Sequence, residues 1–160
     1  MFKSGFIGII GRPNVGKSTL FNAIVGEKIS IIADKPQTTR NKITGIKNLA
    51  DAQLIFLDTP GIHKAKTPLN RAMVQTAHDT LKDADILLML VEANSNIHPQ
   101  DIFLIETLAA VKVPVFLIIN KIDLVEKNLL LPLIDKFRNL YNFREIFIKS
   151  LPMCRLLIQS

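Results

Sequence analysis

The chain has one cysteine, Cys154, among its 160 residues. A single thiol builds no disulfide framework, and no C-x-x-C pair or spaced His/Cys set predicts a zinc site. The sequence also has no uncharged apolar run of the roughly 18 residues that a membrane-spanning helix requires. We expect no cleavable secretory signal, because few residues precede the first glycines and no small-residue cleavage site follows. These absences fit a reducing cytoplasm.

Length and charge set broad limits on the fold and on the binding partners. With 160 residues, of which 48% are hydrophobic, the chain is expected to form one domain with a substantial core. Its formal net charge of +6 is compatible with binding to polyanions. The lysines are scattered rather than clustered, however, so a solvated surface accounts for most of them.

One short segment organises the chain. Residues 11–19 match G-x-x-x-x-G-K-S, the phosphate-binding loop, and consist of Gly11, Arg12, Pro13, Asn14, Val15, Gly16, Lys17, Ser18 and Thr19. An apolar strand over 6–10 precedes the loop, and a helix over 19–25 is expected to follow and to stop at Gly26. The motif requires this strand–loop–helix context, which a chance match would not supply.

The residue types of this loop suit a nucleoside triphosphate. Glycines let backbone N–H groups point at a phosphate, at the positive end of the following helix. Lys17 adds a full charge for the β- and γ-phosphates, and the Ser18 hydroxyl can ligate Mg²⁺.

Strand and helix patterns alternate along the rest of the chain. Apolar or alternating runs predict strands over 42–47, 52–57, 85–91, 113–119 and 145–148. Helical spacing predicts helices over 69–81, 99–110 and 129–140, and residues 27–40 are expected to form mostly loop. This alternation predicts an α/β fold with a mostly parallel sheet. The runs at 85–91 and 113–119 are apolar enough for strands buried on both faces.

The strand over 52–57 ends in Asp58-Thr59-Pro60-Gly61. Ligands of open parallel sheets bind outside the carboxyl ends of the strands. The Asp58 carboxylate can hold Mg²⁺ through its water shell, and Gly61 can offer a backbone N–H to a γ-phosphate. An ordinary strand-to-turn sequence is the alternative. The phosphate loop upstream favours the functional interpretation.

The strand over 113–119 ends in Asn120-Lys121-Ile122-Asp123, an N-K-x-D motif. Guanine offers two adjacent donors, N1–H and the 2-amino group, and the Asp123 carboxylate matches both. Adenine lacks both donors, so the carboxylate would stay unpaired. Asn120 can read the O6/N7 edge of the base or brace the loop, and the Lys121 stem can lie over the base. The motif therefore selects GTP over ATP.

In this order and spacing, the three motifs resemble those of the translation-factor class of P-loop GTPases. More narrowly, residues 11–20, 35–40 and 58–63 are similar to the Era family, bacterial GTPases of ribosome assembly that bind small-subunit RNA. The likeness runs from about residue 5 to about residue 147. It implies a three-layer G domain, a mostly parallel twisted sheet with helices on both faces.

The resemblance also implies an activity and partners. The expected enzyme is a Mg²⁺-dependent GTPase that switches between GTP and GDP. Small-subunit rRNA and the ribosomal subunit are the implied partners, and no DNA is expected. A cytoplasmic location is implied, and peripheral association with the inner membrane is compatible with the family. The oligomeric state stays open.

Several site residues receive their roles from the resemblance alone. Thr39 matches the switch I threonine that ligates Mg²⁺ when a γ-phosphate is present, with Thr38 as the alternative. Ras-like enzymes place a water-orienting glutamine directly after D-x-x-G, where this chain has Ile62. Asn14 is a candidate contributor to catalysis, because in relatives an asparagine at this position helps to hold a monovalent cation such as K⁺. We expect slow intrinsic hydrolysis that a partner stimulates. The implied metal ligands are Ser18, Thr39 and Asp58, and the implied catalytic residues are Lys17, Thr39, Gly61 and Asn14.

The likeness to the family stops near residue 147. Era-family proteins are nearly twice this length and continue into a KH domain that clamps single-stranded RNA, of which this sequence has no counterpart. Residues 148–160 do not continue the family sequence, and Pro152 opposes a helix there. We therefore expect a G domain over 1–147 and an aberrant or truncated tail over 148–160. Without its C-terminal helix, one sheet face would be partly uncovered. A fragment that binds guanine nucleotide but is otherwise idle is the alternative function.

Overall fold

The predicted alternation of strands and helices is present in the computed structural model, which describes residues 2–26, 43–57 and 83–150. In chain order the elements are β1 (Lys3–Ile10), α1 (Lys17–Val25), β2 (Ile43–Asn48), β3 (Ala52–Leu57), β4 (Ile86–Glu92), α3 (Pro99–Thr107), η1 (Leu108–Ala110), β5 (Val115–Asn120), η2 (Ile122–Leu124), α4 (Lys127–Leu140) and β6 (Glu145–Ile148), where η denotes a 3₁₀ helix. All strands lie within three residues of their predicted bounds. The helix predicted over 69–81 and the loop predicted over 27–40 lie outside the described residues.

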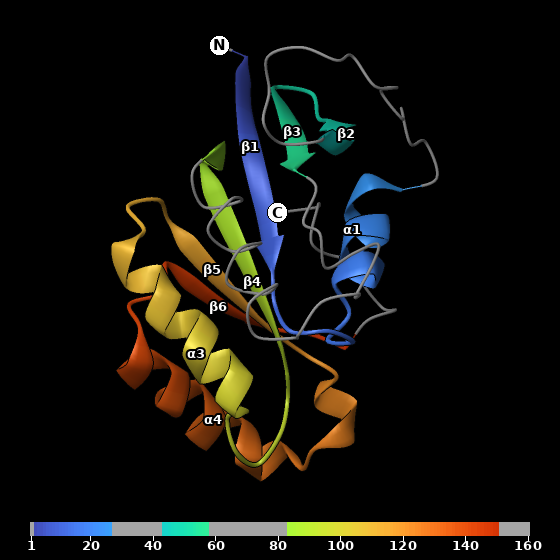
Figure 1. Ribbon diagram of the computed structural model, residues 1–160. Coiled ribbons are helices and arrows are strands. Elements are labelled where there is room, and N and C mark those ends of the chain that lie inside the picture. Colours follow the sequence, from blue (N-terminus) through green and yellow to red (C-terminus); the bar gives the residue numbers. More distant parts are fainter. Residues whose placement is uncertain (1, 27–42, 58–82, 151–160) are drawn as a thin grey trace.

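The strands form a six-stranded sheet in the order β2-β3-β1-β4-β5-β6. The β2–β3 pair is antiparallel, and the other described pairs are parallel. Helix α1 lies on one side of the sheet, and α3 and α4 lie on the other (Figure 1). The predicted fold class, a mostly parallel sheet with helices on both faces, is confirmed.

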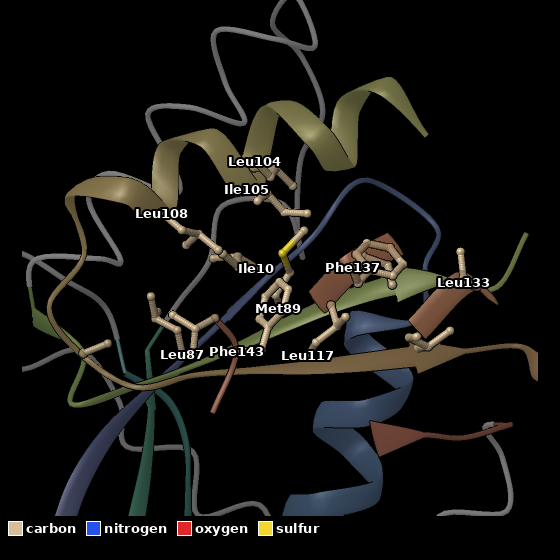
Figure 2. Close-up of a cluster of buried hydrophobic side chains, with 14 of the residues drawn as sticks. Ile10, Leu87, Met89, Leu104, Ile105, Leu108, Leu117, Leu133, Phe137 and Phe143 are labelled. Carbon is tan, nitrogen blue, oxygen red and sulfur yellow. The ribbon is translucent and has the colours of Figure 1, made fainter. Parts of the chain in front are cut away.

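Alternate residues of the central strands face opposite sides of the sheet and contribute to the core on each side. In β1, Ile7 and Ile9 pack with Phe21 and Val25 of α1, whereas Ile10 belongs to the core on the opposite face. Figure 2 shows that opposite core, in which α3 with η1, α4, and strands β4 and β5 contribute Leu104, Ile105, Leu108, Leu133, Phe137, Leu87, Met89 and Leu117. Strands β4 and β5 are buried on both faces, as their continuous apolar runs predicted.

The parallel pairing brings the carboxyl ends of β1, β4 and β5 to one edge of the sheet. The phosphate loop follows β1, and Glu92 and Asn120 are register partners at the ends of β4 and β5. The Ala93 N–H donates to the Asn120 carbonyl at 2.7 Å, which continues the pairing one residue further. This edge therefore places three chain segments close enough to share one ligand.

On the α1 side, the described residues leave an apolar groove of about 520 Å³. Its lining includes Ile24 of α1 together with Leu54, Phe56 and Phe147 of the sheet. The prediction of a missing C-terminal helix concerns residues after 150, which lie outside the described part of the chain. None of the helices in the described ranges is long and apolar enough to cross a membrane.

Candidate nucleotide-binding site

The phosphate loop is a tight turn that its glycines make possible. Gly11 has φ 154° and Gly16 has φ 106°, both in the region that side chains rarely adopt, and Asn14 between them has φ 64°. A Cβ atom at Gly11 would collide with the carbonyl oxygen of Leu90 in β4. Gly16 is the N-cap of α1, and its carbonyl accepts the Leu20 N–H at 2.9 Å. The loop therefore leads directly into the positive end of α1, where a phosphate is favoured.

Lys17 crosses back over this loop. Its Nζ donates to the carbonyls of Gly11 at 2.8 Å and Arg12 at 2.7 Å, and the residue is only 7% exposed. Burial and then the nearby Arg12 charge lower the pKa of Lys17 to about 8, while Asp101 acts in the opposite direction. Ser18 and Thr19 follow it, exposed in the first turn of α1. The Lys17 ammonium, which donates to two loop carbonyls here, lies where it can donate to the oxygens of a bound phosphate instead.

Residues Asn120–Asp123, the N-K-x-D segment that the sequence predicts to be guanine-specifying, contact the phosphate loop through Asn120. Its Nδ2 donates to the Val15 carbonyl at 2.8 Å, and Asn120 is 2% exposed. Val15 is fully buried against Leu20, Leu90 and Ile118, so the bond reaches a fixed point of the loop. Of the two roles open to Asn120 from the sequence, the structure shows the bracing one.

Lys121 makes a second connection between the two loops. It has φ 59°, and its Nζ donates to the Asn14 carbonyl at 2.9 Å and to Glu92 Oε2 at 3.1 Å. The aliphatic part of Lys121 therefore extends from the end of β5 to the phosphate loop, which is the position needed to lie over a bound base.

Asp123 lies in η2 and is exposed, as a carboxylate that receives a ligand must be. The Ser150 hydroxyl donates to Asp123 Oδ1. This bond, then a backbone hydrogen bond and the Lys121 charge, lower the pKa of Asp123, so the carboxylate is an ionised acceptor at neutral pH. Ser150 lies in residues 148–160, the predicted aberrant or truncated tail, and its contact with Asp123 makes it a candidate site residue outside the three motifs.

The Arg12 side chain turns to two carboxylates outside the three motifs. Its Nε lies 3.3 Å from Asp101 Oδ2 in α3, and its guanidinium lies 3.5 Å from Glu92 Oε2 at the end of β4. Neither Asp101 nor Glu92 belongs to the predicted site residues. The position of Glu92 at the carboxyl end of a parallel strand is the signal that could have found it.

The remaining predicted site residues, Thr39, Asp58, Thr59, Pro60 and Gly61, lie outside the described residues. Ser18 is therefore the one member of the predicted Mg²⁺ ligand set that can be placed. Within the described ranges, no three Asp, Glu, His or Cys side chains gather into a metal-binding cluster. The exposed Ser18 hydroxyl beside Lys17 fits a metal ion shared with a bound phosphate rather than one held by protein alone.

A phosphate loop between β1 and α1, joined to an N-K-x-D segment that begins at the last residue of β5, defines the class of P-loop guanine-nucleotide-binding domains. Residues 6–121 match the family of 50S ribosome-binding GTPases, and the chain belongs to this family.

The chain is similar to proteins named GTPase Era. It is 63% identical over 146 residues to the Syntrophus aciditrophicus protein, covering 91% of this chain and 48% of the relative. It is 53% identical over 145 residues to the Ruminiclostridium cellulolyticum protein, covering 91% and 49%. The chain thus spans about half the length of the curated relatives it matches.

Solved structures agree. A crystal structure of Era in complex with MgGDPNP and nucleotides 1506–1542 of 16S ribosomal RNA superimposes with a TM-score of 0.72 at 40% identity, covering 94% of this chain and 52% of that one. An Aquifex aeolicus Era variant bound to GDP·AlF₄⁻ gives a TM-score of 0.67 at 40% identity, covering 93% and 52%. The resemblance to Era that the motifs predicted is confirmed.

Proposed function

We propose that this chain binds GTP and GDP between the phosphate loop and the Asn120–Asp123 segment, and that it hydrolyses GTP as a molecular switch. The observation that carries the proposal is the buried 2.8 Å bond from Asn120 Nδ2 to the Val15 carbonyl. It joins the base-selecting segment to the phosphate-binding loop, so one nucleotide can reach both. The Era structures with MgGDPNP and GDP·AlF₄⁻ support guanine nucleotides as ligands.

Each described side chain has a defined task when nucleotide binds. Lys17 exchanges the carbonyls of Gly11 and Arg12 for phosphate oxygens. Asp123, already ionised and oriented by Ser150, accepts from guanine N1–H and the 2-amino group. Ser18, with Thr39 and Asp58, would hold Mg²⁺, which neutralises charge on the β- and γ-phosphates. Gly61 would offer its N–H to the γ-phosphate.

We further propose that Asn14 helps to bind K⁺ near the phosphates. The support is its place at the outer turn of the loop, where it is exposed with φ 64° and its carbonyl is fixed by Lys121. Ile62 stands where Ras-like enzymes orient water, so charge from a bound cation is an alternative means of assisting hydrolysis.

The wider role that we propose is assembly of the small ribosomal subunit, with 16S rRNA as the partner. The Era structure that contains 16S rRNA nucleotides supports it. A cytoplasmic location follows from this role, and peripheral association with the inner membrane is carried over from the likeness to Era. The competing function is a guanine-nucleotide-binding fragment without turnover.

Phosphate release from GTP and from ATP, with and without Mg²⁺, tests the proposal. We expect slow Mg²⁺-dependent phosphate release from GTP but not from ATP, and faster release when small ribosomal subunits are added. We expect no release in Lys17→Met, which keeps a long unbranched side chain but removes its charge and its bonds to the Gly11 and Arg12 carbonyls. GTP binding without release under every condition would instead support the idle fragment. Release from ATP at an equal rate would contradict the guanine assignment.

A further inference from the structure

Glu92 lies between two cations that come from different loops of the site. Its Oε2 is 3.1 Å from Lys121 Nζ of the guanine-specifying segment and 3.5 Å from the Arg12 guanidinium of the phosphate loop. Its side chain is 25% exposed, compared with 16% for Arg12 and 33% for Lys121, so solvent screens the cluster only in part. One carboxylate thus holds a side chain from each of two loops that a nucleotide must contact together.

Asp101 holds Arg12 from the other side. Its side chain is 2% exposed, and its Oδ2 accepts from Arg12 Nε at 3.3 Å. Its Oδ1 is buried and has no hydrogen-bond partner among the described residues. The first turn of α3 fixes its position, because Pro99 begins the helix and His98 Nδ1 accepts the Gln100 N–H at 3.1 Å. A carboxylate that is excluded from solvent needs a paired cation to remain ionised, so Arg12 and Asp101 fix each other's position.

We propose that Glu92 and Asp101 are positioning residues for nucleotide binding: Asp101 orients Arg12, and Glu92 couples Arg12 to Lys121, which sets the separation of the phosphate loop and the guanine-specifying segment. The inference rests on the proposed function, because it matters only for a ligand that spans both loops. Neither acid is expected to touch nucleotide.

Two contacts explain how the coupling reaches the ligand. The Arg12 carbonyl accepts Lys17 Nζ at 2.7 Å, so a shift of Arg12 also moves the resting position of the phosphate-binding ammonium. The Asn14 carbonyl accepts a hydrogen bond from Lys121 Nζ at 2.9 Å, so Lys121 also contacts the phosphate loop directly. The base and phosphates of a nucleotide are joined covalently, and misplacing one loop by a fraction of an ångström weakens both sets of contacts.

The test is a set of GDP affinities in which the two cations are removed singly and together. Arg12 and Lys121 are replaced by Met, once with Glu92 present and once in Glu92→Gln. With Glu92 present, each single variant should lose GDP affinity. The loss in the double variant should be about 3- to 30-fold smaller than the product of the two single losses, because either substitution alone already breaks the coupling. In Glu92→Gln the single effects should multiply within about twofold, since the shared carboxylate is gone.

Controls separate coupling from folding and from general charge. Asp135→Asn removes the same charge from an exposed ion pair of 3.9 Å in α4 and should change GDP affinity by less than about twofold. Asp101→Asn should weaken GDP binding when Arg12 is present and have little further effect in Arg12→Met. The melting temperature of each variant without nucleotide identifies any that lose the fold, and an unfolded Arg12→Met or Lys121→Met is replaced by the Gln variant at that position.

The outcomes distinguish the two claims. Equal Arg12–Lys121 coupling with Glu92 and with Gln at position 92 would overturn the positioning role while leaving guanine-nucleotide binding intact. Additive effects in both backgrounds would overturn it as well. A wild-type chain that does not bind GDP would overturn the proposed function and, with it, this inference.

Discussion

The hydrogen bond between Asn120 and Val15 should contribute to the stability of the fold and to nucleotide binding, and both contributions can be measured. Asn120→Ala removes the Nδ2 donor and leaves the Val15 carbonyl without this partner at a site where Asn120 is 2% exposed. An unsatisfied buried acceptor costs about 1 to 3 kcal/mol. In a domain of this size, a loss of about 2 kcal/mol lowers the melting temperature by roughly 4 to 8 °C.

Asn120→Asp sharpens the same test. The substitution keeps the shape of the side chain. It places a carboxylate oxygen where Nδ2 lies in the wild type, 2.8 Å from the Val15 carbonyl oxygen, so two acceptors face each other. We expect a larger loss of stability at pH 7 than in Asn120→Ala, with partial recovery in acid, where a protonated carboxyl group can donate again.

Urea unfolding and ligand titration measure the effects. Asn128→Ala, at an exposed position in α4, is the matched control and should not destabilise the chain. Because the bracing role fixes the phosphate loop itself, Asn120→Ala should weaken binding of GDP and of pyrophosphate alike. If Asn120→Ala and Asn120→Asp both unfold within about 0.5 kcal/mol of the wild type, the brace does not support the loop. If only GDP binding weakens, Asn120 reads the base instead.

Three further predictions concern the phosphate loop. The pKa of Lys17 falls from 10.5 to about 8 on folding, so above pH 8 the unfolded state binds more protons. Without nucleotide, the wild-type minus Lys17→Met difference in the free energy of unfolding should therefore rise from pH 8 toward pH 10.5; a flat difference would contradict the burial argument. Gly11→Ala should weaken GDP binding by more than about tenfold, because of φ 154° and the collision with the Leu90 carbonyl. Gly5→Ala, where a Cβ would meet Asp85 Oδ2 at an ordinary 3.5 Å, is the control, and an equal effect of the two would refute the steric account. GTP hydrolysis should be faster in K⁺ than in Na⁺ and lose this preference in Asn14→Ala; turnover independent of K⁺ would rule out the cation role of Asn14.

The sequence predicted those parts of the structure that local patterns determine. Continuous apolar runs located β4 and β5, because a strand buried on both faces has no polar residue to alternate. The phosphate loop was predictable because Gly11 and Gly16 adopt backbone angles that other residues rarely reach. The Asn120–Asp123 motif was predictable from its place after a buried strand.

Contacts between distant segments were not predictable. The pairing of Arg12 with Asp101 depends on the position of α3 over β4, which no local pattern in residues 11–19 encodes. The place of Glu92 at the end of a predicted strand could mark it as close to the ligand edge, but its contacts with Arg12 and Lys121 depend on where the fold places the phosphate loop and the end of β5. The same holds for Ser150, whose bond to Asp123 requires β6 to lie beside β5. The helix predicted over 99–110 tightens into η1 after Thr107, where the Thr107 hydroxyl donates to the Leu104 carbonyl at 2.6 Å.

Titration of the purified chain with GDP and with ADP is the most direct test of guanine-nucleotide binding at this site. Asp123 offers a carboxylate to two donors that guanine has and adenine lacks, and this difference is worth a factor of roughly 10⁴ or more in sites built on such bonds. We expect GDP binding that is lost in Lys17→Met and an affinity for ADP that is weaker by at least about a hundredfold. Equal affinities for GDP and ADP would contradict it.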